Sequence, residues 1–301
     1  MEKEQIISVN QLSYSFGEQK VLDHITLNVP KGSIYGFLGP NGSGKTTTIK
    51  LLLNLLKNNN TNIQLFGKEL NSNREEILKG IGSLIEAPAL YHHLSGFDNL
   101  KAKAIILGID NQRIHDILKI VGLTDAAKKK AGKYSLGMKQ RLGIGLALLS
   151  DPELLILDEP TNGLDPNGII EIRNLIKKLS SEHQKTIFIS SHLLAEVERI
   201  ATHVGILYKG KLNFEGSIEE LQSLKTADIC IETNNNETAV DLLTVSHKVI
   251  SLNNQLRVPF ESQQQIAKIN KTLVNNGFEV YSIYKEKKDL ESIFLDITQT
   301  A

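Results

Sequence analysis

The sequence is poor in features that would place it in a specialised class of protein. It has a single cysteine, Cys230, among 301 residues, which excludes an internal disulfide and indicates a reducing compartment. Basic and acidic residues number 34 each, so no net charge draws the chain to nucleic acid or to an acidic surface. The opening segment MEKEQIISV lacks the apolar run of a signal peptide. The longest uncharged apolar run, residues 142–149, is far shorter than the roughly 20 residues that span a bilayer. We therefore expect that any action at a membrane requires another chain to do the spanning.

Alternating strand and helix patterns predict an α/β fold. Residues 6–30 have the β-branched composition and period-two alternation of strands. Short apolar runs at 33–39, 154–160 and 186–192 also have strand character, with helical patterns after the first and between the last two. Such alternation favours a mostly parallel, doubly wound sheet. Residues 95–150 carry apolar positions at three- and four-residue spacing, which indicates a helical insertion into that sheet.

After residue 216 the pattern changes to a second, shorter series of strands and helices. The last predicted helix of this series is KDLESIFLDIT, residues 288–298. Residues 217–301 are enough for a small α/β domain beside the first. We therefore expect a first domain over 1–216, with a helical subdomain over about 87–150, and an accessory domain over 217–301. No internal repeat is present, so we expect one nucleotide-binding core in the chain.

Residues 39–47, GPNGSGKTT, fit the phosphate-binding pattern G-x-x-x-x-G-K-[ST] between a strand and a helix. Its glycines let backbone N–H groups turn inward, which forms an anion site at a helix N-terminus. Lys45 is placed to reach the β- and γ-phosphates, the Thr46 hydroxyl to bind Mg²⁺, and Thr47 to make a further phosphate contact. The predicted cofactors are ATP and Mg²⁺, and the predicted nucleotide contacts in this loop are Gly39, Pro40, Asn41, Gly42, Ser43, Gly44, Lys45, Thr46 and Thr47.

The predicted strand LLILDEP ends in two acids, Asp158 and Glu159. Open parallel sheets bind ligands beyond the carboxyl ends of their strands. We assign Asp158 to Mg²⁺, through water, and Glu159 to polarising the water that attacks the γ-phosphate. An acidic pair that caps a helix would explain one of these acids, but not both beside a phosphate loop. The two motifs together predict ATP hydrolysis.

The segment 133–166 resembles the ATP-binding subunits of ABC transporters, and the resemblance extends over roughly residues 4–216. YSLGMKQR stands where that family has its LSGGQ-type signature; Ser135 and Gly137 match it, while Leu136 and Met138 depart from the commonest form. The resemblance implies a P-loop NTPase core with an inserted helical subdomain.

Further site residues are implied by this resemblance. TNGLDP corresponds to the loop after the catalytic glutamate, with Asp165 as its acid. His192 stands at the switch histidine, and Phe16 at the aromatic residue that stacks on adenine. The alternatives are a structural role for His192 and a core position for Phe16.

An assembly also follows from the resemblance. The signature serine of one subunit faces the γ-phosphate bound to another, so residues 39–47 of one copy and 135–139 of a second would close over one nucleotide. One chain holds one of each segment. We therefore expect a dimer, with a homodimer as the simplest form, held together by ATP and released by hydrolysis.

Glu86 is the one charge in IGSLIEAPALYHHL, residues 81–94. Most relatives have a glutamine here, whose oxygen reaches Mg²⁺ and the attacking water, so the resemblance gives Glu86 a catalytic and metal-contacting role. A carboxylate adds negative charge near the γ-phosphate, which we expect only the cation and Lys45 to offset. The simple alternative is a strand end that reaches solvent.

A narrower resemblance comes from IEAPALYHHLSGFDNL and from the ending LESIFLDIT. Both are similar to ATPase subunits of bacitracin- and lantibiotic-type self-immunity exporters. This implies ABC-2-type transmembrane permease partners that contact residues 87–93, no nucleic acid partner, a location at the cytoplasmic face of a bacterial membrane, and an antimicrobial peptide as cargo. Three alternatives stay open: an exporter of a drug, sodium or a polysaccharide, a soluble ABC ATPase that acts on DNA or ribosomes, and a slow regulatory ATPase.

Overall fold

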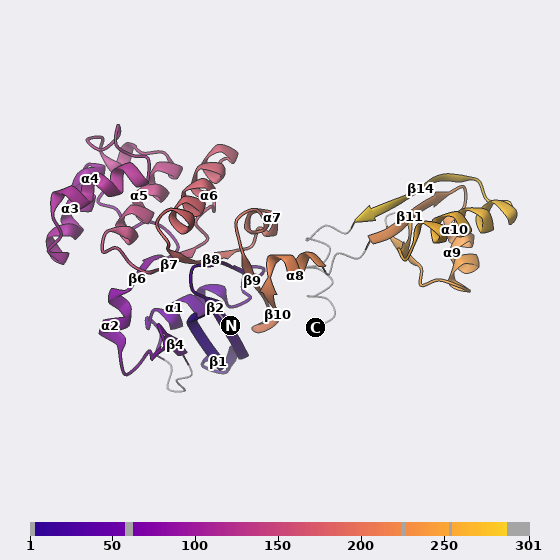
Figure 1. Ribbon diagram of the computed structural model, residues 1–301, viewed down its shortest axis with the longest axis horizontal. Coiled ribbons are helices and arrows are strands. Elements are labelled where there is room, and N and C mark those ends of the chain that lie inside the picture. Colours follow the sequence, from indigo (N-terminus) through magenta and orange to yellow (C-terminus); the bar gives the residue numbers. More distant parts are fainter. Residues whose placement is uncertain (1–3, 58–62, 224–226, 253–254, 288–301) are drawn as a thin grey trace. The chain divides into compact units, whose positions relative to one another are not determined.

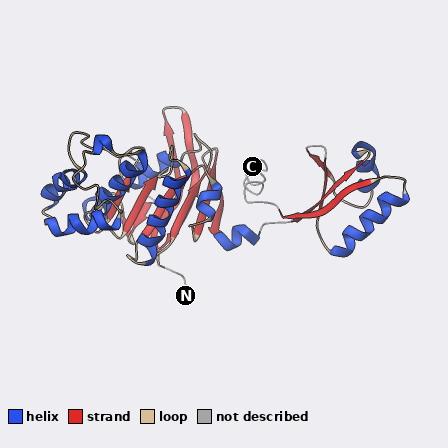
Figure 2. Cartoon of the chain, turned by 90° about the horizontal axis from the view of Figure 1, so that it is seen from above, coloured by secondary structure: helices blue, strands red, loops and turns tan. Residues whose placement is uncertain are grey.

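A computed structural model describes residues 4–57, 63–223, 227–252 and 255–287 (Figure 1). The chain forms two compact units that divide after Ile218. Figure 2 shows that each unit combines β-strands with helices. In the described ranges no helix is at once long enough and apolar enough to cross a bilayer.

Two sheets form the frame of the first unit. One is antiparallel, in the order β2-β1-β4-β5, with strands β1 (Gln5–Phe16), β2 (Gln19–Pro30), β4 (Ile63–Leu65) and β5 (Lys68–Glu69). The other has the order β10-β9-β3-β8-β7-β6, with strands β3 (Ile34–Leu38), β6 (Ile81–Leu84), β7 (Leu154–Asp158), β8 (Thr186–Ser191), β9 (His203–Tyr208) and β10 (Lys211–Ser217). All neighbours in this second sheet are parallel except β9 and β10. The predicted parallel sheet is confirmed, but the pattern does not predict that the N-terminal strands form a sheet of their own.

The parallel sheet is apolar because both of its faces are covered. Every residue of β3, β7 and β8 is buried, as expected for central strands of an α/β sheet. Helix α1 (Lys45–Leu52) contributes Ile49, Leu51 and Leu52 to a core that both sheets share. The phosphate loop therefore leads into a helix that is anchored between two sheets.

A polar contact ties the two sheets of the first unit together. The Tyr35 hydroxyl donates a hydrogen bond to Glu215 at 2.9 Å, and the backbone N–H of Asn28 donates to the same carboxylate oxygen at 2.6 Å. Burial raises the pKa of the Tyr35 hydroxyl well above its usual value, and burial also raises the pKa of the Glu215 carboxyl. Folding therefore shifts the titration of both groups to higher pH.

The predicted helical insertion is confirmed between β6 and β7. It contains α3 (Gly96–Leu107), α4 (Asn111–Ile120), a short 3₁₀ turn (Ala131–Lys133) and α5 (Leu136–Leu148). Ser95 caps α3 by accepting the Asp98 N–H at 3.0 Å. Besides α1 and the helices of this insertion, the described helices of the first unit are α2 (Arg74–Lys79), α6 (Pro166–Ser181) and α7 (Leu194–Glu198). Helix α8 (Ile218–Ser223) starts at the last residue of the first unit and continues into the second.

The second unit alternates strands and helices around one antiparallel sheet. In chain order it has β11 (Ala227–Thr233), α9 (Asn236–Thr244), β12 (Ile250–Leu252), β13 (Gln255–Pro259), α10 (Gln263–Asn275) and β14 (Val280–Lys287), with the strand order β12-β13-β11-β14. Its own core joins Ile229 and Ile231 to Leu243 and Leu273 of the two helices. This βαββαβ order has the ferredoxin-like form. The helix predicted over 288–298 lies outside the described residues.

Candidate nucleotide-binding site

The loop after β3 has the backbone that a phosphate site requires. Gly42 and Gly44 have φ of 79° and 113°, a region that side chains rarely adopt. A Cβ at Gly39 would collide with the backbone oxygen of Leu207. The buried Ser43 hydroxyl has no hydrogen-bond partner in the described part of the chain. An unsatisfied polar atom in a glycine-rich turn at a helix N-terminus fits a phosphate oxygen.

Lys45 lies on the inner side of this loop. Its ammonium donates to the carbonyl oxygens of Gly39 at 2.7 Å and Pro40 at 3.2 Å, and it is 3.4 Å from Oε1 of Glu159. The side chain is only 6% exposed. The Lys45 ammonium can therefore exchange these contacts with carbonyl and carboxylate oxygens for contacts with phosphate oxygens.

Of the three residues predicted to contact Mg²⁺, Thr46 and Asp158 are in direct contact, whereas Glu86 pairs with Lys50. The Thr46 hydroxyl donates to Oδ2 of Asp158 at 3.0 Å, and the Ser190 hydroxyl donates to the other oxygen of Asp158. Among the described residues no group of three His, Cys, Asp or Glu side chains could hold a metal ion alone. This donor set fits Mg²⁺, which takes a few oxygen ligands from protein and the rest from phosphate and water.

Glu159 joins the phosphate loop to the next strand. Its backbone φ is 48°, and its N–H donates to the Ser190 hydroxyl at 2.9 Å. Its second carboxylate oxygen lies 2.8 Å from Nδ1 of His192. A carboxylate held between a lysine and a histidine can accept a proton from water and be stabilised on either side. The arrangement agrees with the predicted roles of both residues.

A cavity of about 330 Å³ opens above these groups. Its lining residues are Phe16, Val21, Asn41, Gly42, Gly44, Lys45, Thr46, Thr47 and Glu159. Phe16 is 50% exposed, and its ring centroid is 5.0 Å from that of Tyr14 in an edge-on contact. The alternative that Phe16 is a core residue is therefore wrong, and its ring is free to stack on a base at the cavity rim.

The signature residues lie around a different cavity, of about 490 Å³. Ser135 begins α5 and accepts the Met138 N–H at 3.2 Å, while Asp165 begins α6 and accepts the Gly168 N–H at 3.0 Å. Both residues line this cavity, together with Gly137, and no residue lines both this cavity and the first one. Two helix N-termini meeting at one hollow favour an anion there. The predicted nucleotide contacts of one chain thus form two separate sets, one around each cavity.

Glu86 lies in the loop after β6 and forms an ion pair with Lys50 that the sequence did not predict. Its carboxylate is 3.0 Å from the Lys50 ammonium of α1, and its side chain is 67% exposed. The expectation that only the metal and Lys45 offset this charge is wrong, because Lys50 already does so. A signal was present: Lys50 is the one charged residue in TTTIKLLLNLL, residues 46–56. The catalytic role of Glu86 stays a prediction.

Comparison with known proteins agrees with this site. The family model for ABC transporters matches residues 22–162. The bacitracin transport ATP-binding protein BcrA of Bacillus licheniformis is 44% identical over 97% of both chains. The lantibiotic transport ATP-binding protein SrtF of Streptococcus pyogenes is 43% identical over 75% of this chain and 99% of its own. A solved ATP-binding subunit of an ABC transporter superposes with a TM-score of 0.64, at 29% identity, over 72% of this chain and 92% of that one.

The matched residues contain the phosphate loop, the signature segment and the two strand-end acids described above. The BcrA match extends through the second unit as well, since it covers nearly the whole chain. This protein therefore belongs to the family of ATP-hydrolysing, ATP-binding subunits of ABC transporters.

Proposed function

We propose that this chain closes as a homodimer around two Mg²⁺–ATP molecules and powers export of a bacitracin-like antimicrobial peptide through an ABC-2-type permease. The observation that carries the dimer is the separation of the two cavities, since residues 39–47 and 135–139 of one chain lie around different hollows. The site acts at the cytoplasmic face of a bacterial membrane in this proposal. Residues 1–216, with the helical subdomain 87–150, form the ATPase domain, and 217–301 form an accessory domain.

The chemistry follows from the contacts of the first cavity. Lys45 exchanges its loop carbonyls for the β- and γ-phosphates. Thr46, and Asp158 through water, would hold Mg²⁺, and the ion would neutralise phosphate charge. Glu159 accepts the proton of the attacking water, and His192 holds the carboxylate in place from the opposite side. Ser135 of the second copy completes the γ-phosphate site through the N-terminus of α5.

The cargo is proposed from the extent of the relatives. BcrA matches 97% of this chain, whereas SrtF matches 75% of it and has no counterpart of the remainder. The match to BcrA thus takes in the second unit, and it covers 97% of BcrA as well. We take bacitracin-like peptides as the first cargo to test and lantibiotics as the second.

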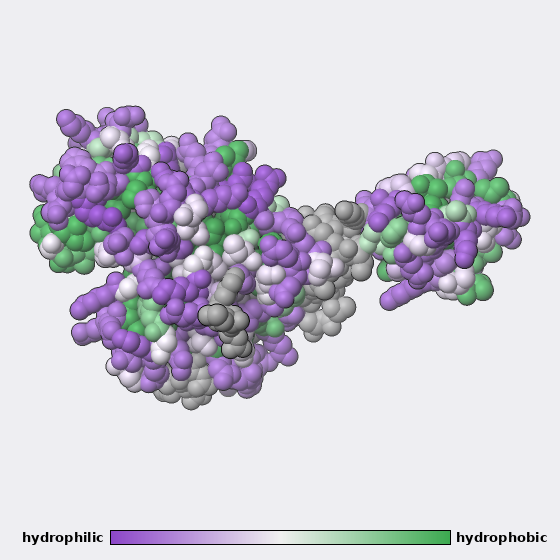
Figure 3. All heavy atoms as spheres, viewed as in Figure 1, coloured by the Kyte–Doolittle hydropathy of each residue, from purple (hydrophilic) through white to green (hydrophobic). Residues whose placement is uncertain are grey.

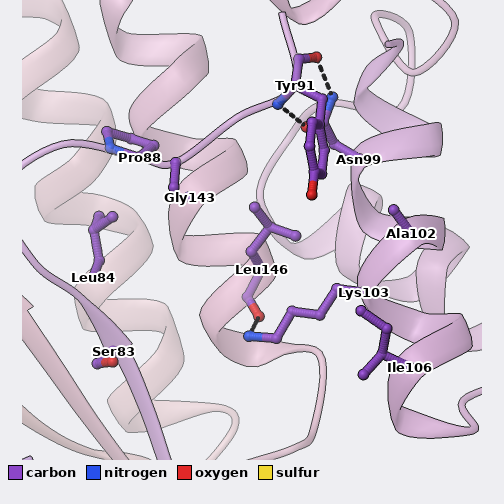
Figure 4. Close-up of a pocket in the computed structure, with 11 residues that line it drawn as sticks. Ser83, Leu84, Pro88, Tyr91, Asn99, Ala102, Lys103, Ile106, Gly143 and Leu146 are labelled. Carbon is purple, nitrogen blue, oxygen red and sulfur yellow. Dashed lines mark hydrogen bonds between the residues drawn. The ribbon is translucent and has the colours of Figure 1, made fainter.

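A pocket of about 280 Å³ supports the proposed permease contact (Figure 4). It lies between the loop after β6 and the inserted helices, and Pro88, Ala89 and Tyr91 of the predicted contact loop form part of its wall. The Asn99 side chain accepts a hydrogen bond from the backbone N–H of Tyr91 at 2.8 Å and donates one to the backbone carbonyl oxygen of Tyr91 at 3.1 Å. These two hydrogen bonds hold the loop against α3. The loop is therefore preorganised rather than loose.

The side of this pocket that α3 forms carries exposed aliphatic side chains. Ile106 lines the pocket and is 84% exposed, and its chain neighbour Ile105 is 70% exposed. Figure 3 shows an apolar patch over α3 in the first unit. Within the pocket, Lys103 donates to the Leu146 oxygen at 3.0 Å, and burial lowers the pKa of its ammonium. Exposed aliphatic side chains around a hollow mark a site for a protein partner. A cytoplasmic helix of the permease, with an aliphatic side chain in the pocket and a carboxylate toward Lys103, fits this surface.

The test is growth of a bacitracin-sensitive host that expresses the chain together with its neighbouring membrane genes. We expect resistance to bacitracin that is lost in Lys45→Ala and retained in Lys119→Ala, a lysine outside the site. Resistance to a drug or to sodium, with none to bacitracin or a lantibiotic, would overturn the cargo. Unchanged resistance in Lys45→Ala would overturn the role of the ATPase.

A further inference from the structure

Two solitary charges, Glu86 and Lys50, are brought together by the fold. Glu86 is the only charged residue in 81–94, and Lys50 is the only one in 46–56. The Lys50 ammonium is 3.0 Å from Oε1 of Glu86. Each segment is otherwise apolar or neutral, although both side chains reach solvent, with 37% of Lys50 and 67% of Glu86 exposed. Each of the two charges thus has an opposite charge as its partner.

A matching pair stands on the neighbouring strand. Strands β6 and β7 are parallel with Leu84 opposite Leu157, so Glu86 and Glu159, each two residues further on, occupy equivalent positions. Both have left-handed backbones, with φ of 59° and 48°. Such backbones persist only where the surroundings impose them, and they concentrate at functional sites.

Helix α1 supplies one lysine to each of these two carboxylates. Lys45, at the start of α1, is 3.4 Å from Glu159, and Lys50, in its last turn, is 3.0 Å from Glu86. The register of β6 and β7 brings both acids out at the same end of the sheet, on loops that leave adjacent strands, where like charges repel. Each needs a countercharge.

We expect ATP binding to change the partner of Lys45 but not that of Lys50. Lys45 lies in the phosphate loop and is drawn to the phosphates when nucleotide binds. Lys50 pairs with Glu86 from the last turn of the helix, and neither of these two residues lines the first cavity. Its charge therefore stays with Glu86 in the bound state. The Glu86–Lys50 pair then carries no net charge, as a glutamine in this place would carry none.

We propose that Lys50 is a positioning residue that neutralises Glu86 and so allows a glutamate to stand beside the triphosphate. The inference rests on the proposed nucleotide site and is independent of the cargo. It predicts the direction in which each substitution changes the affinity for ATP. Loss of Lys50 leaves an unpaired anion near ATP, and loss of Glu86 leaves an unpaired cation near ATP.

The test is a double-mutant cycle of Lys50→Gln, Glu86→Gln and the double variant, read as the Kd for ATP. Titrations are made with the metal chelated, so that charge alone is measured, and are repeated with Mg²⁺. We expect Lys50→Gln to weaken ATP binding about two- to fivefold, Glu86→Gln to tighten it by a similar factor, and the double variant to return close to the parent. These differences shrink between about 0.02 M and about 0.5 M salt, because exposed charges are screened.

Two controls keep the result specific. Lys50→Arg preserves the charge and is expected to bind ATP as the parent does. Lys119→Gln removes the last-turn lysine of another helix and is expected to change nothing. Unchanged ATP affinity in Lys50→Gln and Glu86→Gln, or effects that do not depend on salt, would overturn the inference. Failure of the parent chain itself to bind ATP would instead overturn the nucleotide site.

Discussion

Replacing Glu159 with glutamine separates binding from hydrolysis more cleanly than any other change in the site. The glutamine amide has the shape of the carboxylate, and its oxygen can still accept from Nδ1 of His192, which lies 2.8 Å from Glu159. It cannot accept a proton from water at neutral pH. General-base catalysis contributes about 10²–10⁴ in rate, so we expect ATP turnover to fall by about that factor.

The same change releases Lys45 from its 3.4 Å ion pair with Glu159. That pair is mostly buried, and losing it frees the ammonium for phosphate, which we expect to tighten ATP binding by up to about fivefold, or about 1 kcal/mol. The assays are phosphate release for turnover and equilibrium titration for ATP affinity, with Glu182→Gln as a control, because Glu182 is an exposed acid that lines neither cavity. A Glu159→Gln chain that hydrolyses ATP at half the parent rate would refute the assignment of the base.

Other residues give rise to separate predictions. His192→Ala removes the support for the Glu159 carboxylate, and phosphate-release assays should show turnover reduced by about 10- to 100-fold with ATP affinity changed less than about threefold; an equal loss of both would contradict a catalytic role. Phe16→Ala removes a half-exposed ring at the cavity rim, and titration should show ATP binding weakened by about 1 kcal/mol or more while free triphosphate binds as before. Tyr35→Phe removes a buried donor to Glu215 and should lower the free energy of unfolding by about 1–2 kcal/mol. Because the pKa of Glu215 is raised on folding, the folded chain binds more protons than the unfolded chain just above the usual carboxyl pKa, so stability falls as pH rises through that window. Glu215→Gln should remove this slope in chemical denaturation, and a slope that persists would show that another group causes it.

Local patterns predicted those parts of the site whose function requires a particular residue type at a particular place. The phosphate loop was predictable because only glycines tolerate the backbone at Gly42 and Gly44. Asp158 and Glu159 were predictable because a buried apolar strand that ends in two acids, in a chain with a phosphate loop, is typical of a nucleotide-hydrolysing site. The helical insertion and the strands and helices of the second unit up to residue 287 followed from hydrophobic periodicity.

Contacts between distant segments were not predictable in the same way. Lys50 meets Glu86 only because the fold brings the end of α1 to the loop after β6, and the link from Tyr35 to Glu215 depends on the pairing of β9 with β10. The separation of the N-terminal strands into a sheet of their own also depends on tertiary packing, because alternation indicates a strand with one exposed face but does not show to which sheet the strand belongs. A short window of sequence can show an isolated charge, as it does at Lys50 and at Glu86, but it does not show which distant segment pairs with that charge.

The central claim is that ATP is bound between two copies of the chain. It is tested by mixing an Asn41→Cys chain with a Ser135→Cys chain, both carrying Cys230→Ser and Glu159→Gln, and adding a short bifunctional thiol crosslinker with and without ATP. The account predicts a crosslinked dimer that forms only when both chains and ATP are present. A crosslink equally strong without ATP, or none at all in chains shown by titration to have bound ATP, would contradict it.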